Sequence, residues 1–202
     1  MNQLYYYFKS SIGFASKEID QAFAKINRAD FVPKEYETEA DADYPLPLGF
    51  GATISQPTTV AFMLNKLDPR PKDKILDVGT GSGWTTALLS AIVGNKGQVF
   101  GTEIIEELVQ FGNNNLMKYK INNAKIVLAS KELGLPKSAP YDRILVSAAA
   151  QKLPESLIQQ LKIAGRMVIP VRESVFVIDK ISETEIKKKE YPGFAFVPLK
   201  QT

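Results

Sequence analysis

The chain of 202 residues contains no cysteine and no histidine. Without cysteine there is no disulfide framework, no thiolate metal site and no cysteine nucleophile. Without histidine the chain lacks the side chain that most often serves as a general base near neutral pH and as a ligand for zinc or iron. These absences exclude thiol chemistry and argue against a metal centre, so we expect no bound metal.

Long apolar runs and a strong charge bias are also missing. No apolar stretch approaches the roughly twenty residues that a membrane-spanning helix needs, and residues 1–8 lack the basic start and cleavage region of a signal peptide. The formal net charge of +3 is too small for a nucleic-acid footprint. We therefore expect a soluble, cytoplasmic monomer that binds neither membrane nor nucleic acid.

The first third of the chain is expected to be helical but interrupted. Residues 17–26 have apolar side chains at the i, i+3, i+4, i+7 spacing of an amphipathic helix, with Ser16 as its N-cap. Prolines and glycines in residues 41–51 forbid regular structure over most of that stretch. A second helix is expected to begin after Pro57.

Beyond residue 70 the pattern alternates between strand and helix. Strands are expected over residues 74–78, 98–102, 124–129, 142–147 and 166–171, and helices over residues 84–93, 105–119 and 155–161. Such alternation predicts an α/β fold with a mostly parallel sheet covered by helices on both faces. Short tail strands are expected over residues 175–180, 185–188 and 194–199. We divide this one compact unit into an N-terminal helical and loop extension, residues 1–70, and a core, residues 71–202.

A glycine-rich turn interrupts the first strand–helix pair of the core. The apolar strand ends near Asp77 and is followed by three alternating glycines, Gly79, Gly81 and Gly83. The next expected strand ends on Glu103. Glycine is needed where the backbone takes positive φ or a ligand presses against it, and a carboxylate after the second strand can accept hydrogen bonds from a ribose diol. This arrangement predicts a nucleotide-cofactor site.

The spacing of the glycines selects the cofactor class. A dinucleotide fingerprint needs G-x-G-x-x-G, whereas here the glycines run G-x-G-x-G and the bulky Trp84 follows. With Asp77 ahead of the turn, the motif resembles the first motif of the S-adenosylmethionine-dependent methyltransferases. The resemblance implies S-adenosyl-L-methionine as cofactor and S-adenosyl-L-homocysteine as product.

Ligands of open parallel sheets lie outside the carboxyl ends of the strands. The N–H groups of residues 79–83 open a helix and can meet the methionine carboxylate of the cofactor, and an adenine would lie against residues 129–131. The small side chains of residues 147–150 leave room for a substrate, although close packing explains them equally well. The candidate cofactor-binding residues are Asp77, Gly79, Thr80, Gly81, Ser82, Gly83, Glu103 and Ser130.

Five further motifs narrow the assignment to a family. They are residues 45–57 (PLPLGFGATISQP), 139–150 (APYDRILVSAAA), 154–162 (PESLIQQLK), 165–171 (GRMVIPV) and 196–199 (FVPL). In this order they resemble protein-L-isoaspartate O-methyltransferase. The resemblance implies a Rossmann-like class I methyltransferase core with a seven-stranded sheet and an N-terminal helical extension. It also implies repair of isoaspartyl residues in damaged proteins and peptides.

The same resemblance gives Ser55, with Thr53 beside it, as the candidate catalytic residues. The nucleophile would be an isoaspartyl carboxylate with a pKa of about 4, which is ionised at neutral pH and needs no general base. A protein without histidine can therefore carry out the reaction by positioning alone. Ser55 would orient the substrate carboxylate through its hydroxyl. The alternative role for Ser55 is a turn or N-cap serine ahead of Pro57.

Two departures from the family pattern leave other functions open. Ala129-Ser130-Lys131 replaces the family's Gly-Asp-Gly, whose Asp reaches the adenine amino group, and Ala52 replaces a frequent glutamine. Ser130 can accept one hydrogen bond but lacks the charge and reach of a carboxylate. The alternatives are methylation of another acceptor, such as nucleic acid or a small molecule, and a non-catalytic adenosyl-binding protein of the same fold.

Overall fold

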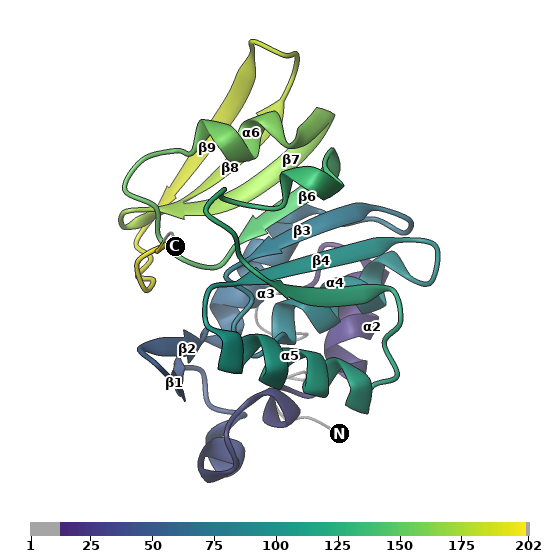
Figure 1. Cartoon of the computed structure of the whole chain (residues 1–202), viewed down its shortest axis with the longest axis vertical. Coiled ribbons are helices and arrows are strands. Elements are labelled where there is room, and N and C mark those ends of the chain that lie inside the picture. The colour runs from purple at the N-terminus through teal and green to yellow at the C-terminus, as the bar shows by residue number, and fades with distance from the viewer. Residues whose placement is uncertain (1–12, 201–202) are drawn as a thin grey trace.

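A seven-stranded sheet forms the centre of the computed structural model, which describes residues 13–200 (Figure 1). The spatial order of its strands is β5-β4-β3-β6-β7-β8-β9. The strands are β3 (Lys74–Val78), β4 (Gln98–Glu103), β5 (Ala124–Leu128), β6 (Tyr141–Val146), β7 (Leu161–Val171), β8 (Ser174–Lys180) and β9 (Ile186–Pro192). Strands β5 to β7 in this order are parallel, and β8 and β9 are antiparallel additions. The carboxyl ends of the parallel strands therefore meet at one edge.

The two faces of the sheet are covered unequally. The helices are α2 (Lys17–Lys25), α3 (Pro57–Leu67), α4 (Trp84–Val93), α5 (Glu106–Lys118) and α6 (Glu155–Gln159), with short 3-10 turns at Arg28–Phe31, Lys34–Glu39 and Pro136–Ser138. Ile75 points into the cluster formed with α2, α3, α4 and α5, whereas its neighbour Leu76 points into the opposite cluster. That second cluster is closed by α6 and the segment before β6. The expected α/β fold with helices on both faces is confirmed, with most of the helical mass on one face.

Residues 41–51 lack regular structure over most of their length, as expected, but residues 46–49 form a strand that the sequence analysis did not predict. Strands β1 (Leu46–Gly49) and β2 (Ala52–Ile54) pair as an antiparallel hairpin. The leucines at 46 and 48 alternate inward, and the prolines are tolerated because a two-stranded ribbon leaves one edge of each strand unpaired. Phe50 at the tip has a φ of +57°, flanked by glycines with φ values of +86° and +74°. These glycines allow the tight reversal.

The expected tail strand over residues 194–199 was also wrong. β9 is the last strand of the sheet, and the tail makes one isolated bridge, between Ala149 and Pro198. Ala149 donates its N–H to the carbonyl of Val197 and accepts a hydrogen bond from Leu199 N–H, each at 2.8 Å. The tail therefore crosses the end of β6 instead of extending the sheet, because its backbone hydrogen bonds are made to the loop after that strand.

The N-terminal extension packs tightly on the core. The Oγ of Ser16 accepts a hydrogen bond from Ile19 N–H at 3.2 Å, which confirms the predicted N-cap. Phe23 of α2 meets Trp84 of α4 edge to face, with ring centroids 5.9 Å apart. Apolar residues from both sides of position 70 share one hydrophobic cluster. The boundary at residue 70 stays a prediction, and the predicted extension's residues 1–12 lie outside the described part.

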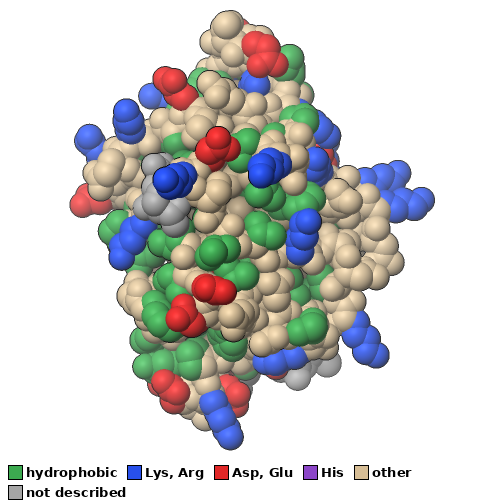
Figure 2. All heavy atoms as spheres, in the orientation of Figure 1, with side chains coloured by type: hydrophobic (Ala, Val, Ile, Leu, Met, Phe, Trp, Pro, Cys, Tyr) green, Lys and Arg blue, Asp and Glu red, His purple; other side chains and the backbone are tan. Residues whose placement is uncertain are grey.

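None of the helices within residues 13–200 has both the length and the apolar character to cross a bilayer. On the face drawn in Figure 2, basic side chains are spread over much of the surface, and acidic side chains lie among them. Exposed large apolar side chains occur at well-separated places in the sequence, namely Tyr44, Phe50, Met117, Leu128, Ile163 and Ile181.

Candidate active site

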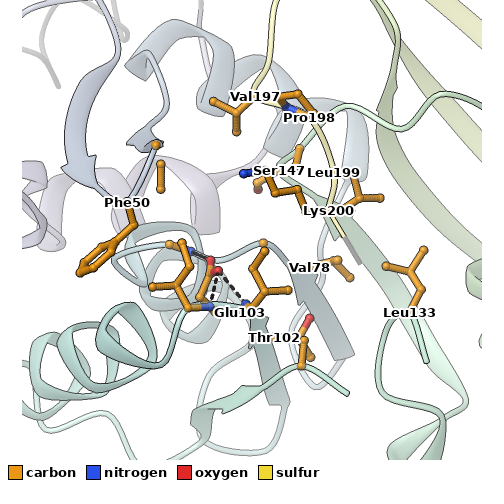
Figure 3. A pocket seen from close by; sticks show the side chains of 18 of the residues that line it. Phe50, Val78, Thr102, Glu103, Leu133, Ser147, Val197, Pro198, Leu199 and Lys200 are labelled. Atoms are coloured by element: carbon orange, nitrogen blue, oxygen red, sulfur yellow. Dashed lines mark hydrogen bonds between the residues drawn. The ribbon is translucent and has the colours of Figure 1, made fainter. Parts of the chain in front are cut away.

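A cavity of about 410 Å³ opens at the carboxyl edge of the sheet. The hairpin supplies Phe50 on one side, and the C-terminal tail supplies Val197 to Lys200 on another (Figure 3). Glu103 lies between them, and Leu133, from the loop after β5, lines a further side of the cavity. The cavity therefore collects residues from segments that are far apart in the sequence, as expected for a ligand site in this class of fold.

A second, smaller cavity of about 30 Å³ adjoins the first. Ser55, Thr80 and Ser82 line the smaller cavity only. The walls of both cavities include Thr53, Gly79, Gly81 and Ser147. The structure thus brings the predicted serine and threonine next to the predicted glycine turn. Ser147, at the end of β6, is a polar residue at this junction to which the sequence assigned no role beyond its small size.

The glycine turn is hydrogen-bonded to the neighbouring strand β4. The N–H groups of Gly79 and Thr80 both donate to the carbonyl of Thr102, at 2.8 and 3.2 Å. A Cβ on Gly79 would make only an ordinary van der Waals contact with Ala148 Cβ, at 3.8 Å, and the backbone of Gly79 lies on the wall of both cavities. With a φ of +74°, this position favours glycine on conformational grounds as well.

Gly83 packs closely against Ile126 and Gly112 and lies away from both cavities. It has a φ of +86°, and a Cβ there would lie 2.9 Å from Ile126 Cδ1 and 3.3 Å from Gly112 of α5. Neither cavity has Gly83 on its wall. Its assignment to cofactor binding stays a prediction, while the contact with α5 gives an independent reason for the third glycine.

The N–H groups of this turn are largely engaged inside the protein. Gly83 N–H donates to the carbonyl of Thr80 at 3.0 Å, and Gly81 N–H donates to Glu103 at 2.9 Å. Together with the two bonds to Thr102, these occupy four of the five N–H groups in residues 79–83. Within residues 13–200, Ser82 N–H has no acceptor. The expected cluster of free N–H groups facing a methionine carboxylate is therefore reduced to one, next to the Ser82 hydroxyl.

Glu103 is the charged centre of the larger cavity. Its side chain is 7% exposed. Its Oε2 accepts from Gly81 N–H at 2.9 Å, and its Oε1 accepts from Ile104 N–H at 2.7 Å and Ile105 N–H at 3.2 Å. A carboxylate offers about four lone-pair sites, so acceptor capacity remains for a ribose hydroxyl. Glu103 thus lies on the cavity wall, and its role in binding the ribose stays a prediction.

Asp77 lies behind the turn, fully buried. Its Oδ2 accepts hydrogen bonds from the hydroxyls of Thr85 and Thr86, both at 2.7 Å, while its Oδ1 has no partner among the described residues. Burial raises the pKa of this carboxyl, the threonine hydrogen bonds lower it, and the charge of Glu103 raises it further. Neither cavity has Asp77 on its wall. Its contact with a cofactor stays a prediction, and its visible role is to tie the turn to α4.

The loop predicted to hold adenine contains an acid that the sequence analysis did not consider. Ser130 lines the cavity, but its Oγ bonds within the loop, accepting from Glu132 N–H at 3.3 Å and donating to the Glu132 carbonyl at 3.4 Å. Glu132 also lines the cavity. Gln160 fixes the loop by donating to the Leu133 carbonyl at 2.8 Å. A carboxylate therefore lies on this loop two residues after position 130.

The alternative role of Ser55 as a helix cap is wrong. The N-cap position of α3 is Gln56, and the cap acceptor is Asp43, whose Oδ1 accepts from Thr58 N–H at 2.9 Å. Ser55 lies one residue before the cap, on the wall of the smaller cavity. Its hydroxyl is therefore not needed to begin the helix.

Sequence comparisons agree with the resemblance described above. The family model for protein-L-isoaspartate(D-aspartate) O-methyltransferase (PCMT) matches residues 1–202. The chain is 43% identical over 195 residues to the protein-L-isoaspartate O-methyltransferase of Methanopyrus kandleri, covering 94% of this chain and 86% of the relative. It is 42% identical over 188 residues to protein-L-isoaspartate O-methyltransferase 2 of Archaeoglobus fulgidus, covering 92% and 86%.

Solved structures give the same result. One protein-L-isoaspartate O-methyltransferase superposes with a TM-score of 0.89 at 26% identity, covering 98% of this chain, which spans 65% of that chain's length. A Plasmodium falciparum protein assigned to the same enzymes was solved in complex with S-adenosyl-L-homocysteine. It superposes with a TM-score of 0.87 at 25% identity, covering 100% of this chain and 98% of its own.

The first prediction concerns Glu103. Replacing Glu103 with Ala removes a charged acceptor and leaves three N–H groups without their partner, so adenosylmethionine binding should weaken by roughly 1.5–3 kcal/mol, about ten- to a hundredfold. Calorimetric titration measures the affinity. Glu106→Ala, an exposed acid at the start of α5, is the control and should bind normally. Unchanged affinity in folded Glu103→Ala protein would remove Glu103 from the cofactor site.

The second prediction separates Ser130 from Glu132. If Glu132 supplies the acceptor for the adenine amino group, Glu132→Gln should weaken adenosylmethionine binding by about tenfold. Ser130→Asp should then leave the affinity nearly unchanged. The opposite pattern, a tighter Ser130→Asp variant and an indifferent Glu132→Gln variant, would mean that the loop retains an adenine pocket served from position 130.

Proposed function

The chain belongs to the protein-L-isoaspartate O-methyltransferase family, and we propose that it methylates the carboxylate of L-isoaspartyl residues in damaged proteins and peptides. The methyl donor is S-adenosyl-L-methionine, which supplies an electrophilic methyl group on its sulfonium. The observation that carries this proposal is the juxtaposition of the Thr53–Ser55 segment with the glycine turn at two adjoining cavities. The family match over the whole chain supports the same reaction.

The residues of the larger cavity fit the cofactor. Glu103 has remaining acceptor capacity for ribose hydroxyls, and the bare backbone of Gly79 forms part of the cavity wall. Ser130 and Glu132 line the far side of the cavity, where an adenine would lie. The cavity carries both the acceptors and the bare backbone that a nucleoside with a charged amino-acid tail requires.

The chain's own residues act by orienting the substrate. The isoaspartyl carboxylate is already ionised at neutral pH, so no side chain has to remove a proton. The hydroxyls of Ser55 and Thr53 can donate hydrogen bonds to this carboxylate and hold one oxygen toward the larger cavity. Phe50 and the tail residues Val197 and Leu199 line the opening and limit the access of water. Excluding water strengthens the attraction between the two opposite charges.

We extend the proposal to the protein's state and setting. It acts as a monomer. It acts in the cytoplasm, where cells keep adenosylmethionine, and its partners are isoaspartyl peptides and proteins. It has no nucleic-acid partner, and the dispersed charges of Figure 2 support that part of the proposal.

The third prediction tests the acceptor. Wild-type protein with tritiated adenosylmethionine should label an isoaspartyl peptide. It should label neither the same peptide with a normal aspartyl residue nor RNA. Ser55→Ala should slow transfer by about ten- to a hundredfold, the loss of one hydrogen bond to a charged group, with adenosylmethionine affinity nearly unchanged.

Other outcomes would assign a different function. Labelling of RNA or of the normal peptide would mean another acceptor class. Tight adenosylmethionine binding without transfer to any of the three would mean a non-catalytic adenosyl-binding protein. Equal rates for wild type and Ser55→Ala would remove Ser55 from the site but leave the reaction in place.

A further inference from the structure

We propose that Arg28 is a positioning residue for methyl transfer: its buried guanidinium holds the backbone at Ile54 and Ser55 and thereby aims the Ser55 hydroxyl at the substrate carboxylate. This inference rests on the proposed function. Neither the cofactor nor the substrate needs to touch Arg28, which lies in the 3-10 turn Arg28–Phe31 of the N-terminal extension and lines neither cavity.

The contacts of Arg28 converge on the active-site segment. The side chain is 0% exposed. Its Nη1 donates to the carbonyls of Ala40 and Ala42 at 3.0 and 3.2 Å. Its Nη2 donates to three more carbonyls, those of Tyr44 at 2.9 Å, Ile54 at 3.4 Å and Ser55 at 3.2 Å. One side chain thus joins the segment before the hairpin to the segment that follows it.

The charge of Arg28 is balanced by carbonyl dipoles. No carboxylate among residues 13–200 forms an ion pair with its guanidinium. Burial lowers the pKa of Arg28 to about 10, and the charges of Asp43, Tyr44 and Asp41 oppose that effect. The guanidinium is therefore charged at neutral pH. Its face lies over the Trp84 ring, 5.7 Å from the centroid, at the start of the helix that follows the glycine turn.

Asp43 holds the segment on the other side of Ser55 through hydrogen bonds. Asp43 accepts hydrogen bonds from Gln56 Nε2 at 3.1 Å and from Thr58 N–H and Oγ1 at 2.9 and 3.0 Å. Ser55 therefore lies between carbonyls held by a cation and N–H groups held by a carboxylate. Arg28 and Asp43 both belong to the extension, and neither bonds to the hydroxyl of Ser55, a residue that lines the smaller cavity.

A packing role alone does not account for a charge at this place. Replacing a buried charged group by an apolar one of similar volume is often neutral or stabilising, because the charge must be desolvated. Arg28 donates to the backbone on both sides of the hairpin, and five carbonyls would each lose a hydrogen bond without it. A positioning role explains both the charge and the choice of acceptors.

The test compares Arg28→Lys with Arg143→Lys. Lysine keeps the charge but has three donors in place of a fork of five, so it cannot hold the five carbonyls in their present arrangement. Arg143 is the matched control, because its Nε donates to the carbonyls of Leu67 and Asp68 at the opposite end of α3. For each variant, kcat and KM are measured with an isoaspartyl peptide and the adenosylmethionine Kd by calorimetry.

Arg28→Lys should lower kcat by about tenfold or more. Its adenosylmethionine Kd should change by less than about threefold, which shows that the fold is intact, and Arg143→Lys should keep the wild-type kcat. In a Ser55→Ala background, Arg28→Lys should cost less than about twofold, because the hydroxyl that it aims is already absent. As a second measurement, guanidinium ion should restore part of the kcat lost in Arg28→Ala.

Several results would overturn the positioning role. One such result is an Arg28→Lys variant whose kcat equals that of the wild type. Another is an Arg28→Lys substitution that lowers kcat by the same factor in the wild-type and Ser55→Ala backgrounds. A folded Arg28→Ala protein that guanidinium fails to rescue would also contradict it. Wild-type protein that transfers no methyl group to the peptide would instead refute the proposed function itself, and the inference with it.

Discussion

The hydrogen bond from Gly81 N–H to the carboxylate of Glu103 is the contact on which the cofactor side of the molecule depends. The same carboxylate accepts from Ile104 and Ile105, so it ties the glycine turn of β3 to the start of α5. Its side chain is buried, which makes each of these charge-assisted bonds expensive to leave unmade. The turn is therefore shaped before a ligand arrives, and Glu103 can serve the ligand without losing that function.

Methyl transfer to a carboxylate requires two charged reactants at one place, and the two halves of this chain each build one side. The sheet edge supplies the cofactor cavity, because parallel strands bring the turn, Glu103 and the end of β6 together. The extension supplies Thr53 and Ser55 on a segment held by Arg28 and Asp43. Since both halves share one hydrophobic cluster, their relative placement is fixed by the core. On the proposed mechanism, positioning takes the place of a general base.

The features that could be predicted from the sequence are those that depend on residues close together in the chain. The N-cap at Ser16, the alternation of strands and helices and the site of Glu103 follow from periodicity and spacing. The hairpin was missed because its prolines and glycines read as breakers, although they suit a two-stranded ribbon with a tight tip. The five carbonyls around Arg28, the loop bonds of Ser130 and the contact of Gly83 with α5 depend on residues distant in sequence or on the exact loop path, which no local pattern reveals.

The central claim is that the protein positions an ionised carboxylate and supplies no base. The most direct test is the single-turnover rate of methyl transfer to an N-acetylated isoaspartyl peptide as a function of pH. If the protein only positions the substrate, the rate stays constant between about pH 6 and 8 and declines only as the substrate carboxylate is protonated, near pH 4. A rate that instead follows an ionisation near pH 7, unaltered when the peptide is changed, would show that a side chain of the protein takes part in proton transfer and would contradict the account.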